Sequence, residues 1–325
     1  MVDADGRNGA VKLACELIGD APPGQIDQVI SDVRKIVSHH ADGDGIIDEC
    51  LREVMPKYNL ENFTEASYQL NGEGNRFLIT PHGIVSKEGE DSEANLFLDP
   101  RTRQVVKFDH SKRTCEAHSQ SDEPAHEAKR NAIERAVLRY AAETYPHGTA
   151  SVYSCPSSSS SSSGGDGGEA SQPGAAIVIC IASCISKASS FWSGRWLSEW
   201  TVTFNPGATS ASGATSASLE GRSSVYTHYY ENGNVQLRSK RDFQPTQVFE
   251  AKGDGEAAEA IVKAISDAEL KYQQELEGSL HEFSASTFKG LRRQLPVTQS
   301  TFPWTTGAAA LASQLCKRNT NTAED

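Results

Sequence analysis

The sequence predicts an α+β fold in which helices open the chain, strands of a central antiparallel β-sheet follow, and a long helix covers that sheet. Apolar stripes at helical spacing in residues 26–37 and 256–280 predict amphipathic helices. The continuous apolar run at 176–185 is typical of a strand that is buried on both faces. The Asn232-Gly233 pair between two strand-like runs indicates a tight hairpin, which makes neighbouring strands antiparallel.

The first sixty residues are predicted to form three helices joined by short loops, as an antiparallel hairpin or small bundle. Apolar residues recur at helical spacing in 11–18, 26–37 and 46–54. Pro56 has no N–H to continue the helical hydrogen bonds, so we expect the third helix to end at Met55-Pro56.

Residues 42–48 read D-G-D-G-I-I-D, which imitates the middle of a calcium-binding EF-hand loop. His40 would occupy the first ligand position and Leu51 the position of the bidentate glutamate. Neither side chain offers the oxygen that calcium needs there. We therefore predict a surface turn between two helices and a function that does not depend on calcium.

The next part of the chain is predicted to be rich in short strands and to end in a helix. Apolar runs at 75–80, 95–101 and 104–110 are separated by Gly and Pro breaks, as in strands joined by turns. Residues 124–145 then show one apolar helical face, formed by the side chains of Ile133, Val137 and Tyr140.

Two loose loops are predicted within the central sheet. One precedes the strand at 176–185, and the other follows the strand at 194–204. Serine and glycine dominate 156–172, a composition that cannot bury a core, and a second loop is expected at 207–218. Between them, side chains four apart in a strand lie on one face. We interpret the aromatic residues on that face as core packing rather than as a ligand cage; they are Trp196, Trp200 and Phe204.

The chain carries no recognisable signature of an enzyme, a cofactor site or a metal site. It lacks a P-loop, G-x-G-x-x-G, H-E-x-x-H, and G-x-S-x-G in a strand–turn–helix context. His82, His110 and His118 are too isolated in the sequence to predict a metal site, so we interpret them as ordinary surface or turn histidines. We predict a protein that is not an enzyme.

The charge and cysteine content restrict the compartment and the partner. A net charge of −12 argues against nucleic acid as the main partner. Seven scattered cysteines without a Cys-x-x-Cys pair are typical of reduced thiols. The first residues lack the apolar run of a signal peptide, and the longest apolar run is too short to span a bilayer. We expect a soluble cytoplasmic protein.

Basic residues gather near the end of the chain in F-K-G-L-R-R-Q-L-P-V-T-Q-S-T-F-P-W, residues 288–304. Lys289 and Arg293 are four apart and would share one face of a helix, and Arg292 adds a third cation. Two readings remain open on the residues alone. The segment is either the basic last turn of a helix or a docking surface for an acidic protein.

Several segments resemble the α subunit family of the F-actin capping proteins, over residues 9–304. The resemblance rests on L-R-R-Q-L-P-V-T followed by Trp304, and on A-P-P-G-Q-I-D-Q-V-I-S-D-V-R near the start. It is extended by F-L-I-T-P-H-G, F-L-D-P-R, K-F-D-H, W-S-G-R-W-L-S-E-W and T-H-Y-Y-E-N-G-N-V-Q-L. The family forms heterodimers that close the fast-growing barbed ends of actin filaments.

The resemblance implies a β subunit joined through a shared antiparallel sheet, and an actin-binding site at the end of the chain. Cationic Lys289 and Arg293 match family residues that contact actin, whereas Gln299 stands where the family usually has Arg or Lys. A short amphipathic helix at 308–317 matches the mobile C-terminal extension that meets actin. The full set of expected actin-binding residues is Lys289, Arg292, Arg293, Trp304, Leu311 and Leu315. Phosphoinositide binding to the basic segment is a further family feature.

The resemblance also implies a division of the chain into four parts. These are a helical stalk at 8–60, a small β-rich globule at 61–122, a central part at 123–286 and a C-terminal basic segment with its amphipathic extension at 287–325. An alternative of the same fold is a cytoskeletal adaptor, heterodimeric or homodimeric, in which capping is weakened or lost. Whether the chain needs a β subunit or forms a homodimer is left open by the sequence.

Overall fold

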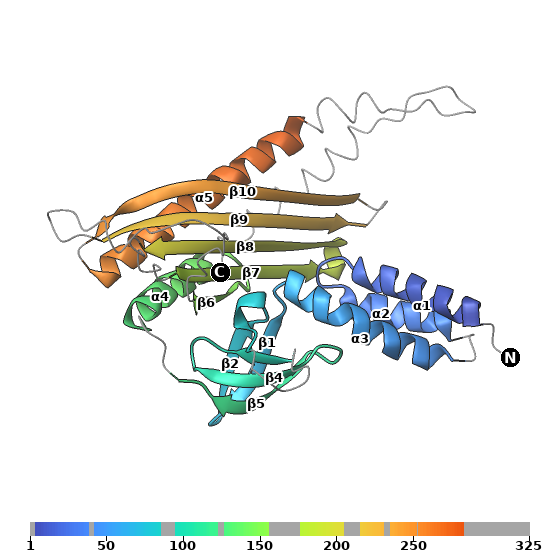
Figure 1. The fold of residues 1–325 in the computed structure, drawn as a ribbon. Helices are drawn as coiled ribbons and strands as arrows, with labels where there is room; N and C mark the ends of the chain where they lie inside the picture. The colour runs from blue at the N-terminus through green and yellow to red at the C-terminus, as the bar shows by residue number, and fades with distance from the viewer. Residues whose placement is uncertain are drawn as a thin grey trace, which may run out of the picture. The chain divides into compact units, whose positions relative to one another are not determined.

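The computed structural model describes residues 4–38, 42–85, 95–122, 127–155, 176–204, 215–230, 235–251 and 253–282 (Figure 1). The chain divides into two compact units, residues 1–266 and 267–325. Of the second unit, the structure describes residues 267–282, which are helical. The fold combines helices with antiparallel sheets, which confirms the predicted α+β class.

The N-terminal part is a bundle of three helices, as predicted. Helix α1 spans Ala4–Gly19, α2 spans Ile26–Val37 and α3 spans Gly43–Glu61, and each contacts the other two (Figure 1). The apolar stripes meet in a dry core between the helices. Its most completely buried side chains are Ile18, Ile46, Ile47, Cys50 and Met55.

The expected end of the third helix at Pro56 is wrong, because α3 continues past it to Glu61. A proline inside a helix removes one hydrogen bond and costs about 3 kcal/mol. The helix continues because the turns around and after the proline bury Met55, Tyr58 and Asn59. Burying an apolar side chain the size of methionine contributes about 1.5–3 kcal/mol, which offsets much of that cost.

The expected surface turn at 42–48 is also wrong, because α3 already begins at Gly43. The helical phase places Ile46 and Ile47 in the bundle core with no exposed surface. Asp44 lies on the outside, where its carboxylate is 3.1 Å from the guanidinium of Arg34 on α2. The acidic residues of the EF-hand-like segment are therefore the exposed side of a helix.

The small β region consists of two antiparallel sheets. Strands β1 (Glu65–Leu70) and β2 (Glu73–Leu78) form a hairpin, and β3 (Leu96–Leu98), β4 (Gln104–Asp109) and β5 (Thr114–Gln120) form the second sheet. The strands expected within 75–110 are confirmed. Strand β5 was not predicted, because its residues are mostly exposed and show no apolar run.

The central sheet has five antiparallel strands that follow one another in sequence, in the order β10-β9-β8-β7-β6. Neighbouring strands pair over long stretches, with Trp200 opposite both Ile179 and Gly221. The predicted strands at 176–185 and 194–204 are confirmed. The strands are β6 (Thr149–Cys155), β7 (Ala176–Lys187), β8 (Trp192–Phe204), β9 (Thr215–Tyr229) and β10 (Val235–Ala251).

The second predicted loop is too long, because residues 215–218 already belong to β9. The serine-rich composition hides a strand there, since Ala217 is buried and pairs with Phe204 of β8. The Ser/Gly-rich insertion at 156–172 and the Asn232-Gly233 turn lie outside the described residues.

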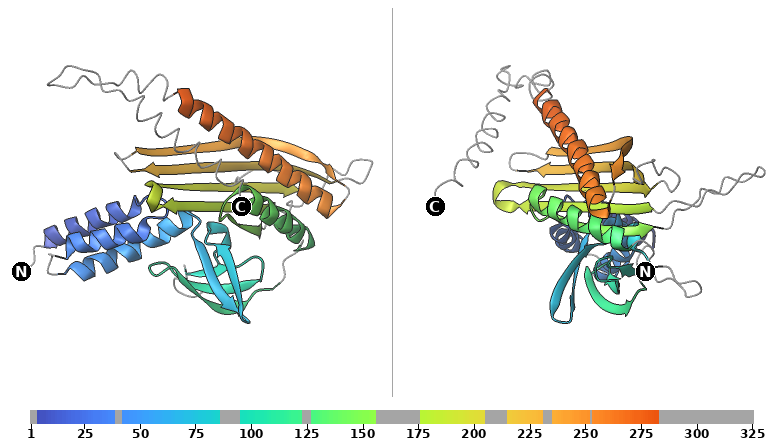
Figure 2. Two further views of the ribbon diagram at one scale, coloured as in Figure 1. Left: turned by 180° about the vertical axis from the view of Figure 1, so that it is seen from behind. Right: turned by 90° about the vertical axis from the view of Figure 1, so that its left-hand side faces the viewer.

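The two faces of the central sheet carry different layers (Figure 2). One face packs against the predicted central helix α4 (Glu127–Thr144), which contacts β6 and β7 and places Lys129 over the ring of Phe204 on β8. The first half of helix α5 (Asp254–Glu282) lies on that same face and joins α4 through an ion pair between Arg139 and Glu259. On the other face, Arg195 of β8 contacts Tyr58 of the helical bundle, and Glu199 contacts His82 of the small β region. Both predicted helices are confirmed, and the domain boundaries remain a prediction.

Candidate partner-binding edge and polar clusters

The predicted actin-binding residues lie outside the described part of the chain. This applies to the whole set, Lys289, Arg292, Arg293, Trp304, Leu311 and Leu315, and to Gln299. The described residues instead define two other features that bear on function. One is an edge of the central sheet, and the other is a set of polar side chains on the face that meets the helical bundle and the small β region.

Strand β10 forms one edge of the central sheet and pairs with β9 alone among the described strands. The edge runs along the whole of Val235–Ala251, one of the longest strands in the sheet. Its pairing shifts between Phe243 and Thr246, around Pro245, a residue that an edge strand tolerates. An exposed edge offers backbone N–H and C=O groups to another strand, so β10 is a candidate surface for assembly.

Strand β6 forms the opposite edge of the sheet and contacts the small β region. There the Ser151 hydroxyl of β6 accepts a hydrogen bond from the backbone N–H of Leu78 at 2.9 Å. The Tyr153 hydroxyl donates to the carbonyl oxygen of the same residue, also at 2.9 Å. Strand β6 is thus joined to β2 of the small β region through its side chains.

The edge strand is fixed to the interior of the sheet by an aromatic stack. The indole of Trp200 on β8 and the ring of Phe243 on β10 lie with centroids 4.7 Å apart. Gly221 of β9 lies between them in the register, opposite both residues. A Cβ atom on Gly221 would come within 2.4 Å of the indole, so the stack requires glycine at this position.

On the other face, a row of polar side chains connects the sheet to the helical bundle. The ring of Tyr226 lies between two guanidinium groups, 5.8 Å from Arg195 and 4.4 Å from Arg238. Arg195 donates a hydrogen bond to the hydroxyl oxygen of Tyr58 on α3, and burial lowers the pKa of this arginine. Arg238 is 3.6 Å from the carboxylate of Asp20, which follows α1. The edge strand therefore reaches the bundle through charged contacts.

A cleft of about 670 Å³ opens beside this row, between the ends of α1 and α3 and strands β8–β10. The cleft is lined by equal numbers of basic and acidic side chains, so its charge favours neither anionic nor cationic ligands. The cationic residues are Arg195, Arg222, Arg238 and Lys240, and the acidic ones are Asp20, Glu61, Glu199 and Asp242.

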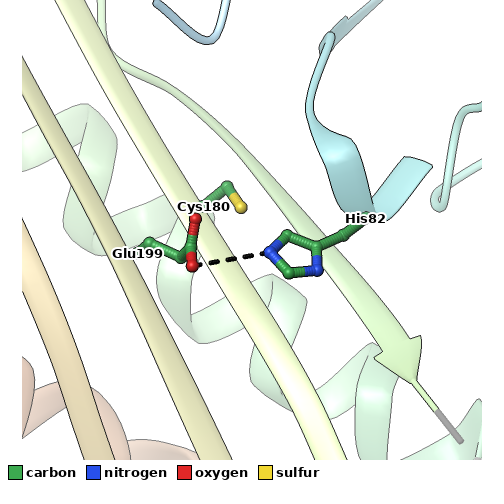
Figure 3. Close-up of side chains that lie close together, drawn as sticks. All are labelled: His82, Cys180 and Glu199. Atoms are coloured by element: carbon green, nitrogen blue, oxygen red, sulfur yellow. Dashed lines mark ion pairs between the residues drawn. The ribbon is translucent and has the colours of Figure 1, made fainter. Parts of the chain in front are cut away.

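A second polar cluster joins the small β region to the sheet (Figure 3). His82, in the short 3-10 helix η1 (Pro81–Gly83), points its Nε2 at Oε1 of Glu199 on β8, 3.5 Å away. The thiol of Cys180 on β7 lies beside them, and the three potential ligand atoms are all within 4.8 Å of one another. The thiol of Cys155 and the carboxylate of Glu199 raise the pKa of His82 to about 9.

The sequence predicts that the three histidines are ordinary surface or turn residues. His82 and His110 do lie in turns, in η1 and directly after β4, but both are held in contacts with other parts of the fold. His82 belongs to the cluster just described, and His110 is buried against the rings of Phe97 and Phe108. His118 is exposed, as expected. The cluster could not be seen in the sequence, because its residues come from three elements separated by up to about a hundred positions and are brought together only by the sheet register.

None of the described helices is long and apolar enough to cross a bilayer. The six cysteines in the described residues are free thiols. The expectation that the chain has no catalytic activity stays a prediction.

Comparison with known proteins gives a consistent result along most of the chain. The family model described as F-actin capping protein alpha subunit matches residues 14–314. The F-actin-capping protein subunit alpha of Dictyostelium discoideum is 31% identical over 297 residues, which cover 90% of this chain and 92% of the relative. The subunit of the same name from Arabidopsis thaliana is 31% identical and covers 88% of this chain and 85% of its own length.

A solved structure shows the same fold. It is described as the homodimeric actin capping protein alpha subunit from Plasmodium berghei. It matches with a TM-score of 0.65 and 20% sequence identity, over 89% of this chain and 98% of that chain. Together with the family match, this confirms the resemblance seen in the sequence motifs, and the chain belongs to the family of F-actin capping protein alpha subunits.

Proposed function

We propose that this chain is the α subunit of a dimeric capping protein that binds the barbed ends of actin filaments and blocks the exchange of actin subunits, without calcium. The observation that carries the proposal is the extent of the family match, which runs from residue 14 to residue 314. That range includes the basic segment at 288–304 as well as the sheet and the helical bundle. The family match therefore includes both the basic segment that would bind actin and the folded part of the chain that would support this segment.

Dimer formation is supported by the edge of the central sheet. Strand β10 could continue the sheet into a β subunit, because edge backbone groups gain hydrogen bonds when a second strand pairs with them. The helical bundle also exposes apolar side chains: Leu13 and Leu17, one turn apart on α1, are 56% and 42% exposed. A partner that covers both the edge and this helix face would bury backbone and apolar surface together.

A β subunit is the partner that the family relationship favours. A second copy of this chain is the alternative, since the Plasmodium berghei protein with this fold is described as homodimeric. The two possibilities are separated by purifying this chain with and without candidate β subunits and measuring the mass of the assembly.

Docking to actin would be electrostatic first and apolar second. The chain has a net charge of −12, so most of its surface would repel an acidic filament. Lys289, Arg292 and Arg293 would steer the basic segment to acidic actin side chains. Trp304, Leu311 and Leu315 would then bury apolar surface and slow dissociation. The same cations would attract phosphoinositide headgroups, which would compete with actin.

We place the protein in the cytoplasm, at the actin cytoskeleton. The family relationship supports this assignment, and so do the six described free thiols, which are typical of a reducing compartment. A function without catalysis follows from the same relationship, because capping needs only a bound surface.

The second candidate function is a cytoskeletal adaptor of the same fold in which capping is weakened or lost. Gln299 favours it, because an Arg or Lys usually stands there in the family. Binding to filament ends through the basic segment should weaken as the salt concentration rises, because salt screens exposed charges. An adaptor that binds actin elsewhere or not at all would lack this dependence.

The test is the elongation of labelled actin from filament seeds, with this chain alone and together with candidate β subunits. Arrest of growth only when a β subunit is present supports the heterodimer, and arrest by the chain alone supports a homodimer. Folded protein that leaves elongation unchanged under both conditions, with assembly confirmed by mass, would contradict capping and favour the adaptor.

A further inference from the structure

We propose that His82, Cys180 and Glu199 form a binding site for a divalent transition metal of the zinc class, which would fasten the small β region to the central sheet. The site goes beyond the capping function and does not depend on it. Its residues come from η1, β7 and β8, so a metal there would join two parts of the fold that the sequence separates by about a hundred positions.

The ligand types fit zinc. An imidazole nitrogen, a thiol sulfur and a carboxylate oxygen are the three side-chain donors that zinc takes in proteins, at about 2.0–2.3 Å in a tetrahedral arrangement. Calcium and magnesium prefer oxygen ligands and would not select a thiol. Three protein ligands would leave the fourth position for water.

The spacing of the ligand atoms fits as well. Two ligands of a tetrahedral zinc ion lie roughly 3.5 Å apart, given bond lengths near 2.1 Å. The distance from His82 Nε2 to Glu199 Oε1 is 3.5 Å, longer than the 2.7–2.9 Å typical of a charged hydrogen bond. The Cys180 sulfur lies within 4.8 Å of both atoms, so small side-chain rotations would complete the site.

Neighbouring side chains hold two of the ligands in place. Arg222 lies 3.1 Å from Oε2 of Glu199, which leaves Oε1 directed at His82. The His82 ring also donates a hydrogen bond to the sulfur of Cys155. Partners of this kind orient metal ligands in known sites. His82 and Glu199 keep 27% and 15% of their side-chain surface exposed, and Glu199 lines the cleft beside η1, so an ion has a path from solvent.

Binding would exchange protons for the metal. The ion would take the place of the proton on Nε2 of His82 and of the thiol proton of Cys180, and both protons would be released to solvent. Without a metal, the same residues form an ion pair between His82 and Glu199 beside a neutral thiol. That arrangement is the alternative that the experiment must distinguish.

The test uses the full-length chain, with its partner if it needs one, stripped of metal by chelation and titrated with Co²⁺ and Zn²⁺. We expect one Co²⁺ per chain, with absorption from a thiolate–cobalt bond. Cys180→Ser should abolish that absorption, and Glu199→Gln or His82→Gln should weaken binding by more than the roughly 10–100-fold typical of losing an outer partner. Cys184→Ser, which removes an exposed thiol from the same strand, should change neither.

A measurement on the unaltered protein covers the case in which a variant does not fold. X-ray absorption of the zinc-loaded wild-type chain should show one sulfur and otherwise nitrogen or oxygen ligands. No stoichiometric binding, two or more sulfur ligands, or cobalt–thiolate absorption that survives Cys180→Ser would each overturn the proposal. The cluster would then be the ion pair alone.

Discussion

Trp200 and Phe243 stack across an intervening strand, with ring centroids 4.7 Å apart, because the residue between them in the register is Gly221. Trp200 is almost fully buried, at 2% exposure, so the stack belongs to the core of the sheet and also supports its outer strand. Because Gly221 of β9 has no side chain, Phe243 can reach Trp200, and this contact holds the edge strand β10 in position.

Gly221→Ala should therefore destabilise the protein. The added Cβ would lie 2.4 Å from the Trp200 ring, and overpacking of this kind typically costs about 1–3 kcal/mol. The measurement is urea unfolding at one fixed protein concentration, followed by tryptophan fluorescence. Gly253→Ala is the matched control, because a Cβ there meets no atom within 4 Å. Equal midpoints for the two variants would contradict the assigned packing.

Arg130 of α4 should be among the most sensitive charged residues. Its side chain is fully buried and contacts the carboxylates of Glu127 at 2.6 Å and Glu134 at 3.3 Å. It also donates to the carbonyl oxygen of Val152 on β6 at 3.1 Å, which joins the helix to the sheet. Arg130→Ala would leave buried negative charge uncompensated, at a cost of about 3–5 kcal/mol.

Denaturant unfolding measures this effect, with Arg135→Ala on the exposed side of the same helix as the control. The double variant Arg130→Met with Glu134→Leu should recover part of the lost stability, because it removes the charge of Glu134 together with that of Arg130 and leaves only the carboxylate of Glu127 without its partner. An Arg130→Ala protein as stable as the control would show that the buried ion pair is wrongly assigned.

The edge strand should tolerate proline on one side of its backbone only. Successive residues of a strand direct their N–H groups alternately toward β9 and away from it. Of the pair Lys240→Pro and Arg241→Pro, one variant loses a hydrogen bond to β9 and should be unstable. The other should fold normally and lose assembly with its partner, as measured by sedimentation. If the variant that folds normally still assembles with its partner, β10 is not the interface.

Removing cations from the basic segment should weaken capping without affecting assembly. Lys289→Ala with Arg293→Ala deletes two charges that would face acidic actin, whereas Lys263→Ala with Lys271→Ala deletes two exposed charges from α5. We expect only Lys289→Ala with Arg293→Ala to lower the affinity for filament ends. The affinity of this variant should also depend less on the salt concentration. Loss of dimer assembly in parallel with capping would mean that the segment has a structural role instead.

The sequence predicted the elements with strong periodicity and missed those defined by long-range contacts. The apolar run that became β7 and the stripe that became α5 were clear, because each repeats its pattern over ten residues or more. Pro56 misled the prediction because burial of Met55 and Tyr58 outweighs the local effect of a proline. The start of β9 was missed because a serine-rich segment gains its strand structure from pairing with β8.

The candidate sites show the same division. The basic segment is contiguous and could be found from composition and motif resemblance. The cluster of His82, Cys180 and Glu199 depends on the register of β7 with β8 and on the placement of η1, which no local pattern specifies. The open edge at β10 depends on the order of the strands, which also becomes visible only in the folded sheet.

The most direct test of the proposed function is fluorescence microscopy of single actin filaments, in which the two ends are distinguished by their growth rates. With the assembled dimer present, growth at the fast barbed end should stop while the slow pointed end continues to grow. The dimer carrying Lys289→Ala and Arg293→Ala should release barbed ends sooner. Continued barbed-end growth in the presence of folded, assembled wild-type protein would contradict the central claim that this chain is part of a capping protein.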